Sequence, residues 1–176
     1  MTSKLVPLIS EADIARALQT LAKEIDQDYD GKPLVVVTVL KGAFIFAADL
    51  IRKITTPISR VELIRLSSYG SGTNSSGQVK IFSDLAPEAI IRQHVLLVED
   101  IVDTGRSTAT AIALLKQHHP ASVKLCSLLD KPARRIVPVE IDYLGFTIED
   151  HFAIGYGLDW DERYRELSGI YAVEEE

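Results

Sequence analysis

The sequence is poor in cysteine and has no apolar stretch long enough to cross a membrane. Its one cysteine, Cys126, lies in the apolar run VKLCSLL, so an internal disulfide is excluded and a reducing compartment is expected. The opening residues, MTSKLVPLISEAD, lack the continuous apolar segment of a signal peptide. The run GAFIFAADLI (42–51) is too short for a span and contains Asp49. We therefore expect a cytoplasmic protein with no membrane partner.

An excess of positive charge is also missing. Nineteen Lys and Arg residues against 25 Asp and Glu residues give a net charge of −6, and the sequence pI is about 5.3. This balance argues against nucleic acid as the main partner. It does not exclude small anionic substrates, because local geometry and a bound metal ion can outweigh net charge. With 176 residues, 47% of them hydrophobic, the chain is expected to form a single domain over 1–176.

What the sequence does contain is an alternation of short β-branched runs with helical patterns. Helices are predicted over 10–28, 42–54 and 104–119, and strands over 33–40, 59–66, 79–82, 94–99, 121–130 and 139–148. This order predicts an α/β fold with a mostly parallel central sheet flanked by helices. Ligands of such sheets bind at the carboxyl ends of the strands. Lys41, the segment 99–107 and Lys131 lie at the ends of three predicted strands, so we expect them together at this edge. The acidic end, EEE, is expected to be a solvated tail.

The segment 67–78, SSYGSGTNSSGQ, breaks this pattern. It holds three glycines, five serines and no charged residue, so we expect a flexible loop with a strand on its far side. A phosphate-binding loop usually leads into the start of a helix, and no helix start adjoins this segment. We therefore interpret the segment as a lid and not as a phosphate-binding loop. Ordering such a loop costs roughly 1–2 kcal/mol of conformational entropy per residue. A lid over about 67–80 is therefore expected to be open without substrate.

The stretch VLLVEDIVDTGRSTAT (95–110) carries the strongest chemical signal. A strand ends beside three carboxylates, Glu99, Asp100 and Asp103, and a helix is predicted to begin near Thr104. The first N–H groups of a helix lack internal partners and attract anions, and Gly105 allows a phosphate to approach the backbone. The chain has neither G-x-x-x-x-G-K-[ST] nor G-x-G-x-x-G, which excludes a P-loop and a dinucleotide fingerprint.

The three acids suit a sugar carried next to that phosphate. Ionised carboxylates only accept hydrogen bonds, so Glu99 and Asp100 could bind two hydroxyl groups of a ribose. The alternative is a solvated acidic loop in which Asp103 caps the following helix. The acids alone do not decide between these interpretations, but the apolar strand, Gly105 and the neighbouring hydroxyls favour the binding site.

VLLVEDIVDTGRST resembles the 5-phosphoribosyl-1-pyrophosphate (PRPP) signature of the type I phosphoribosyltransferases, in the form found in the 6-oxopurine branch. The likeness extends from about Pro33 to Tyr171. It implies the family fold, with a small hood formed by the N-terminal and C-terminal segments and a flexible lid. It also implies that Glu99 and Asp100 bind the ribose hydroxyls and that Asp103 is the general base or acid at purine N7. The residues implied to hold the 5′-phosphate are Thr104, Gly105, Arg106, Ser107 and Thr108.

Three further motifs follow in the order of the same family. In VLKGAF, the resemblance implies that Lys41 and Gly42 contact pyrophosphate, often through a cis peptide; from the residues alone, a solvated lysine is equally suitable. In LLDKPARR, it implies that Lys131 donates to O6 of the purine, which selects against the donor amino group of adenine. In HFAIGYGLDWDERYRE, it implies that Phe152 stacks on the purine and that Arg165 reaches pyrophosphate.

The resemblance also implies roles for several neighbouring residues. The Ala153 main chain and Asp159 lie at the purine edge, and Ser68 and Tyr69 belong to the lid. Mg²⁺ is the implied cofactor, and its implied ligands are Asp159, Glu99 and Asp100. A homodimer or a homotetramer is the implied assembly.

The expected activity is purine salvage. A 6-oxopurine, hypoxanthine and also guanine, would take the phosphoribosyl group of PRPP at N9 and release pyrophosphate. Xanthine or uracil is an alternative substrate within the same fold. A regulator that binds PRPP and a nucleic acid is an alternative of another class, but such regulators tend to replace the third acid, and Asp103 is present.

Overall fold

The structure, a computed structural model, describes residues 3–68, 79–82 and 85–175. A six-stranded sheet lies at its centre, with strand order β4-β3-β2-β5-β6-β7. All neighbours are parallel except β4, which pairs antiparallel with β3. The strands of this sheet are β2 (Leu34–Leu40), β3 (Ile58–Ser68), β4 (Val79–Phe82), β5 (His94–Val102), β6 (Ser122–Asp130) and β7 (Tyr143–Thr147). The predicted α/β fold with a mostly parallel sheet is confirmed.

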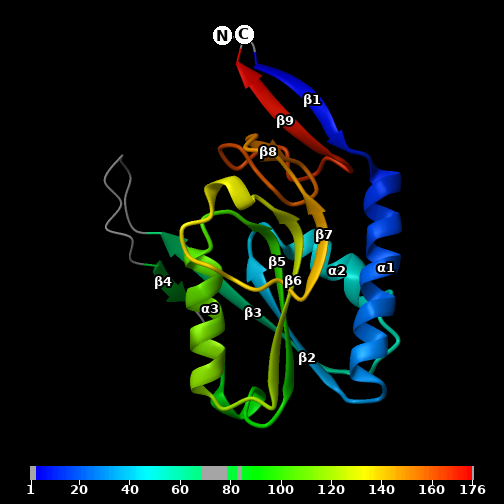
Figure 1. Ribbon diagram of the computed structural model, residues 1–176, viewed down its shortest axis with the longest axis vertical. Coiled ribbons are helices and arrows are strands. Elements are labelled where there is room, and N and C mark those ends of the chain that lie inside the picture. Colours follow the sequence, from blue (N-terminus) through cyan, green and yellow to red (C-terminus); the bar gives the residue numbers. More distant parts are fainter. Residues whose placement is uncertain (1–2, 69–78, 83–84, 176) are drawn as a thin grey trace.

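In the described part of the chain, three α-helices cover the sheet, α1 and α2 on one face and α3 on the other (Figure 1). Their bounds are α1 (Glu11–Tyr29), α2 (Phe44–Ile51) and α3 (Arg106–Gln117), and two short 3₁₀ helices span Pro87–Ala89 and Pro132–Arg134. Helix α1 begins at a capping box, in which Ser10 accepts from the Asp13 N–H and the Asp13 carboxylate accepts from the Ser10 N–H. Among the described residues, no helix is long and apolar enough to span a membrane.

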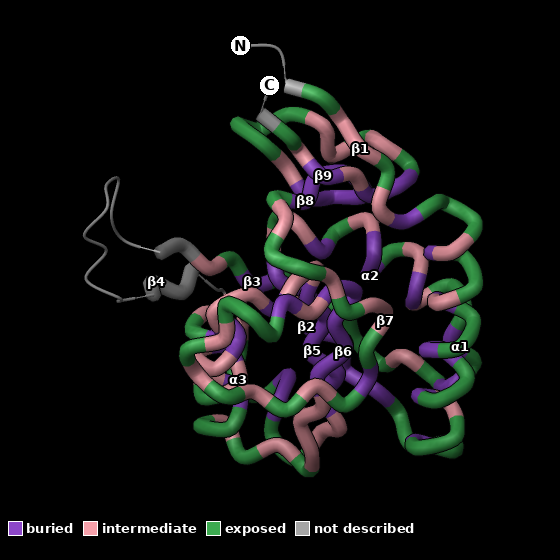
Figure 2. Tube along the Cα trace, turned by 45° about the horizontal axis from the view of Figure 1, so that its top comes forward, coloured by how far each residue is buried: buried purple, intermediate pink, exposed green. Residues whose placement is uncertain are grey.

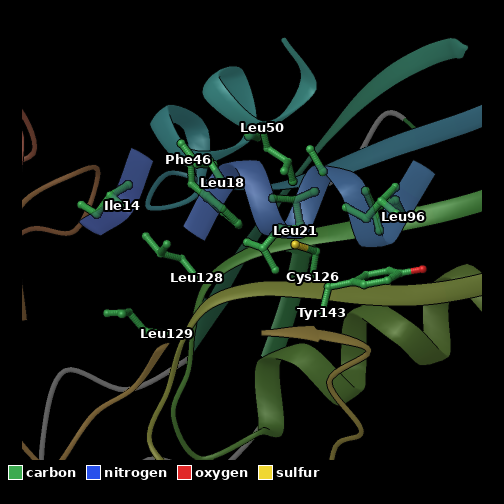
Figure 3. Packing of buried hydrophobic residues seen from close by; sticks show 14 of the residues in the cluster. Ile14, Leu18, Leu21, Phe46, Leu50, Leu96, Cys126, Leu128, Leu129 and Tyr143 are labelled. Atoms are coloured by element: carbon green, nitrogen blue, oxygen red, sulfur yellow. The ribbon is translucent and has the colours of Figure 1, made fainter. Parts of the chain in front are cut away.

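The buried side chains form two clusters, one on each face of the sheet. Ile14, Leu18 and Leu21 of α1 pack with Phe46 and other residues of α2 on one face, as Figure 3 shows. On the other face, Ala111 and Leu115 of α3 pack on odd-numbered positions of β2 and β5. The tube in Figure 2 shows the buried residues concentrated in β2, β5 and β6, between the helices. The near-continuous apolar runs of these strands follow from burial on both faces.

A second, smaller sheet is built from both ends of the described chain. Its order is β1-β9-β8, and its strands are β1 (Ser3–Ile9), β8 (Ala153–Ile154) and β9 (Ile170–Glu175). All its pairs are antiparallel, and it lies at the top of the molecule in Figure 1. The prediction of a free acidic tail is therefore wrong for Glu174 and Glu175, whose backbone extends β9 and pairs with β1. The Glu174 side chain is nevertheless exposed to solvent, as predicted.

The strand order also fixes where a ligand can bind. From β2 the chain passes to β3 on one side, and β5 then pairs on the other side of β2. Such a reversal leaves an opening between the carboxyl ends of the two strands, which is where ligands of doubly wound sheets bind. Lys41 follows β2 directly, and the acids Glu99 and Asp100 lie near the end of β5. Ser68 ends β3, whereas Tyr69 and most of the predicted lid lie outside the described residues.

Candidate active site

Glu99 and Asp100 both lie within β5, which continues to Val102, whereas the sequence pattern ends this strand at Glu99. The Glu99 side chain is buried, and its Oε2 has no hydrogen-bond partner among the described residues. Burial, and then the adjacent Asp100 carboxylate, raise the pKa of Glu99 well above its usual range. Burial likewise raises the pKa of Asp100 to about 6, against the opposing effect of backbone N–H donors and Arg165. These two adjacent carboxyl groups are therefore suited to binding a hydroxyl donor or a cation.

Gly42 packs directly against Asp100. A Cβ placed on Gly42 would lie 1.6 Å from Asp100 Oδ2 and 2.5 Å from its Cγ, so only glycine fits without displacing the carboxylate. Gly157 in turn fits against Gly42, since a Cβ there would lie 2.1 Å from the Gly42 carbonyl oxygen. The segment after β2, the end of β5 and the loop at Gly157 therefore meet at one point. The resemblance places a cis bond at Lys41–Gly42, but the cis peptide joins Leu40 to Lys41.

The turn between β5 and α3 has the form of an anion cradle. Gly105 is the N-cap residue of α3, with a φ of +81° that glycine adopts readily, and no side chain caps the helix. A Cβ on Gly105 would lie 2.2 Å from the Val137 carbonyl oxygen. The Thr104 carbonyl accepts hydrogen bonds at 2.9 Å from both Ile136 and Val137. The first turn of α3, including Ser107 and the buried Thr108, is thus presented by a fixed backbone.

Asp103 and Lys131 face this region from neighbouring strand ends. Asp103 Oδ1 lies 3.2 Å from Arg134 Nε but accepts no hydrogen bond among the described residues. Lys131 is 5% exposed, so it is not an ordinary solvated surface lysine. Its N–H donates to the Val102 carbonyl at 3.0 Å, which ties the segment after β6 to the end of β5. Its ammonium lies 3.9 Å from Asp150 Oδ1.

The segment 152–165 supplies aromatic and charged groups. Phe152 is 53% exposed, and its ring meets that of Trp160 edge to face at a centroid distance of 6.4 Å. Arg165 donates to the Gly157 carbonyl at 2.7 Å and pairs with Asp159 Oδ1 at 2.8 Å. Ala153 is buried in β8. This segment therefore carries an exposed aromatic ring, and also a guanidinium group whose position is fixed by two contacts.

The two cations expected to bind pyrophosphate converge on one carboxylate. Lys41 Nζ lies 2.8 Å from Glu162 Oε2, and Arg165 Nη2 lies 3.4 Å from the same oxygen. Hydrogen bonds from Lys41 and Arg165 lower the pKa of Glu162. These contacts place Lys41 and Arg165, which are 124 positions apart in sequence, on one anion. A carboxylate occupies the position between the two cations.

The back of this loop is anchored to α2. Tyr156 is nearly buried, and its hydroxyl donates to Asp49 Oδ2 at 2.7 Å. A cavity of about 610 Å³ lies behind it, lined by residues of α1, α2 and the segment 156–168. Glu99, Asp103 and Lys131 are not among the residues that line this cavity. The cavity is therefore separate from the site at the carboxyl ends of the central strands.

The carboxylates fit a metal ion that completes its shell from a substrate. No group of three His, Cys, Asp or Glu residues suited to holding a metal is found in the described part of the chain. Mg²⁺ is commonly held by one or two carboxylates together with substrate phosphates and water. The buried Glu99 Oε2, which lacks a hydrogen-bond donor, and the adjacent Asp100 provide such a pair. The Asp159 carboxylate already accepts from Arg165 and the Glu162 N–H.

Sequence reasoning missed four residues in this cluster: Arg134, Arg135, Asp150 and Glu162. Arg135 donates to the Val102 and Asp103 carbonyls at 2.9 and 3.0 Å and pairs with Asp130. Charged residues are common on surfaces, so a single sequence does not distinguish these four from ordinary solvated side chains. The one available signal concerns only the arginines: Arg134 and Arg135 are adjacent and lie three and four positions after the strand-end Lys131.

The chain belongs to the phosphoribosyl transferase domain family, whose model matches residues 10–162. It is 46% identical over 173 residues to a hypoxanthine-guanine phosphoribosyltransferase of Aquifex aeolicus, covering 98% of this chain and 96% of that protein. A hypoxanthine phosphoribosyltransferase of Staphylococcus aureus has a similar solved structure, with a TM-score of 0.89, 40% identity, and coverage of 96% of this chain and 90% of that one.

A further relative is a longer protein. The chain is 45% identical over 163 residues to the bifunctional protein TilS/HprT of Listeria innocua. The match covers 93% of this chain but only 25% of that relative's length. The chain thus spans about a quarter of the bifunctional relatives and nearly all of the Aquifex aeolicus protein.

Proposed function

We propose that this chain transfers the 5-phosphoribosyl group of PRPP to N9 of a 6-oxopurine, hypoxanthine and also guanine, in purine salvage. The observation that carries the proposal is the meeting of a glycine-capped anion cradle, an acid pair that includes the buried Glu99, and a buried lysine at one sheet edge. Family membership and the names of the similar proteins support the same activity. In the reaction, N9 forms a bond to C1′, and pyrophosphate leaves C1′ with the bonding electrons.

PRPP would lie across the carboxyl ends of β2 and β5. Its 5′-phosphate would bind the turn of Thr104, Gly105, Arg106, Ser107 and Thr108, where the N-terminus of α3 favours an anion. Glu99 and Asp100 would accept hydrogen bonds from the ribose hydroxyls. A hydroxyl group from the substrate would also supply the hydrogen-bond donor that Glu99 Oε2 lacks among the described residues.

The purine would lie between the segment 152–160 and the ends of β5 and β6. Phe152 is exposed enough to stack on the base. The Lys131 ammonium would donate to O6, and the Ala153 main chain and Asp159 would face the opposite edge. Asp103 would take the proton from N7 as N9 attacks, which makes the base a stronger nucleophile.

Pyrophosphate would be held by Lys41, the Gly42 backbone and Arg165, with Glu162 giving way to the incoming anion. Mg²⁺, bound when PRPP is present, would neutralise charge that builds up on the leaving group. Glu99, Asp100 and Asp159 are the proposed ligands. Ser68 and Tyr69 would belong to a lid over about 67–80 that excludes water from the reacting sugar.

We also propose that the chain acts in the cytoplasm and self-associates. Its cysteine, Cys126, is fully buried, and burial raises the thiol pKa, which suits a structural and unreactive role. Large apolar side chains on β3 and α2 remain exposed, namely Val61, Leu63 and Phe44. Val61 and Leu63 pair with Val36 and Thr38, so they face the side of the sheet that carries α2. A homodimer or homotetramer would cover this face.

The test is a panel of bases. With PRPP and Mg²⁺, hypoxanthine and guanine are expected to give nucleotide, and adenine is not. Product from xanthine or uracil alone would show that this base is the substrate in place of hypoxanthine and guanine. No product from any base would contradict the proposed transferase activity. PRPP binding without turnover would support a regulator.

Asp103→Asn tests the proposed base. The variant is expected to lose about 10²-fold or more in kcat, because an amide cannot accept the N7 proton. PRPP affinity should change little, and calorimetric titration measures it independently of turnover. An unchanged single-turnover rate would remove Asp103 from this role.

A further inference from the structure

A chain of ion pairs joins the two groups assigned to the purine. Arg134 Nε lies 3.2 Å from Asp103 Oδ1, and Arg134 Nη1 lies 3.7 Å from Asp150 Oδ1. The same Asp150 oxygen lies 3.9 Å from Lys131 Nζ. Arg134 and Asp150 therefore connect the proposed base to the proposed O6 donor, although neither residue has been given a role above.

Contacts made by the two flanking residues, Lys131 and Arg135, hold the Arg134 segment in place. Arg134 ends the 3₁₀ helix Pro132–Arg134, whose flanking residues are both bound to the end of β5. On one side, the Lys131 N–H donates to the Val102 carbonyl, and on the other, Arg135 donates to the Asp103 carbonyl. The Arg134 guanidinium thus approaches Asp103 from a short segment that is fixed at both ends.

The exposure of the Arg134 and Asp150 side chains indicates that their ion pairs position other groups and contribute little to the stability of the fold. The side chains of Arg134 and Asp150 are 48% and 55% exposed. Ion pairs this exposed contribute little to the stability of a fold. Asp103 Oδ1, by contrast, is fully covered yet accepts no hydrogen bond among the described residues, so the nearby guanidinium is its main electrostatic partner. The effect of removing Arg134 should therefore appear in catalysis.

We propose that Arg134 and Asp150 are positioning residues for the transfer reaction. Arg134 holds Asp103 by Oδ1, so that Oδ2 is directed to the purine N7 proton. Asp150 acts as a shared counter-ion that holds Arg134 and the Lys131 ammonium at a fixed separation, matched to N7 and O6 of one purine. The inference rests on the proposed roles of Asp103 and Lys131.

The experiment measures single-turnover rates as well as KM, because product release can limit kcat. Arg134→Gln is expected to lower the single-turnover rate about tenfold and to leave the KM for PRPP within twofold. Arg134→Lys, which keeps the charge, should recover part of the rate. Asp150→Asn should lower the rate and also raise the KM for hypoxanthine several-fold. Arg16→Gln, which removes an exposed ion pair with Asp13 on α1, should match the unaltered protein.

A double-mutant cycle separates action through Asp103 from a general effect. In the Asp103→Asn background, Arg134→Gln should change the remaining rate less than twofold. An equal tenfold loss there would overturn the inference, as would a full rate for Arg134→Gln alone. If Asp103→Asn itself keeps the full rate, the proposed base is wrong and this inference falls with it. A slow Asp103→Asn with a fast Arg134→Gln would overturn this inference alone.

Discussion

At the scale of single residues, the site depends on two glycines, whose lack of a side chain lets neighbouring segments approach closely. Gly42 lacks a Cβ at the position where Asp100 Oδ2 lies, and the Gly42 carbonyl occupies the space that a Cβ on Gly157 would need. Three segments far apart in the sequence are thereby in van der Waals contact. The acid pair keeps its place because nothing larger than hydrogen projects from the neighbouring chain.

Gly42→Ala should therefore damage activity more than stability. The added methyl group collides with a carboxylate at the end of a short side chain, which can rotate away from the ribose site. We expect a loss of at least about tenfold in kcat/KM for PRPP, equivalent to about 1.4 kcal/mol or more, and a small shift in Tm. Steady-state kinetics and thermal unfolding measure the two effects.

Gly31→Ala is the matched control. Gly31 has a φ of +74° and no atom within 4 Å of an added Cβ, so alanine there is strained but does not collide. It should cost about 1 kcal/mol of stability with unchanged kinetics. Equal kinetic losses in both variants would show that general strain, and not the Asp100 contact, is responsible.

At the scale of elements, α1 is tied to the connection between α2 and β3. Asp26 of α1 accepts hydrogen bonds from the N–H groups of Thr55 at 3.0 Å and Thr56 at 2.7 Å, and from the Thr55 hydroxyl at 2.8 Å. Burial raises the pKa of Asp26, but these hydrogen bonds together outweigh it, and the pKa lies below its usual range. The ionised form is the one that holds the two elements together.

Asp26→Asn should reveal this as a pH-dependent loss of stability. A carboxylate with a lowered pKa stabilises the fold fully above its unfolded pKa of about 4, and the contribution disappears as the pH falls through the folded value. At pH 7 we expect a loss of roughly 1–2 kcal/mol, allowing for solvent screening at this partly exposed site. Urea unfolding at pH 7 and at pH 3.5 measures it.

The difference between Asp26→Asn and the unaltered protein should narrow at the lower pH. The exposed neighbour Asp30 supplies a control, because Asp30→Asn should be close to neutral at both values. A stability difference of the same size at pH 7 and pH 3.5 would contradict the assignment to the carboxylate charge.

Sequence periodicity predicted the central elements well and the small sheet poorly. The runs of β2 and β6 are apolar because both faces are buried, which gives a strong local signal. β1 and β9 pair with each other across the whole chain, and such non-local pairing leaves little trace in a short window. β5 was predicted to end at Glu99, yet it continues to Val102.

The same reasoning explains which site residues could be predicted. Glu99, Asp103 and Gly105 belong to one contiguous stretch, so their pattern could be read directly from the sequence. Arg134 and Glu162 contribute through contacts made only in the folded chain. The cis bond at Leu40–Lys41 has no proline to mark it in the sequence.

At the scale of the whole molecule, the proposed self-association predicts that exposed apolar side chains on one face matter. Val61 and Leu63 are 47% and 53% exposed on β3. Replacing both with Glu should shift the protein from a dimer or tetramer to a monomer, because charged side chains would have to be buried on association. Sedimentation velocity measures the change, and Ile91→Glu, away from this face, is the control. A monomeric unaltered protein would contradict the proposal.

The pairing of β1 with β9 has a consequence for how this chain can be joined to others. Ser3 lies opposite Glu175 in the small sheet, so the two described ends are one strand spacing apart, about 5 Å. The two ends of the described chain therefore lie side by side in the small sheet. A second domain attached at either end would project from the same edge of the small sheet.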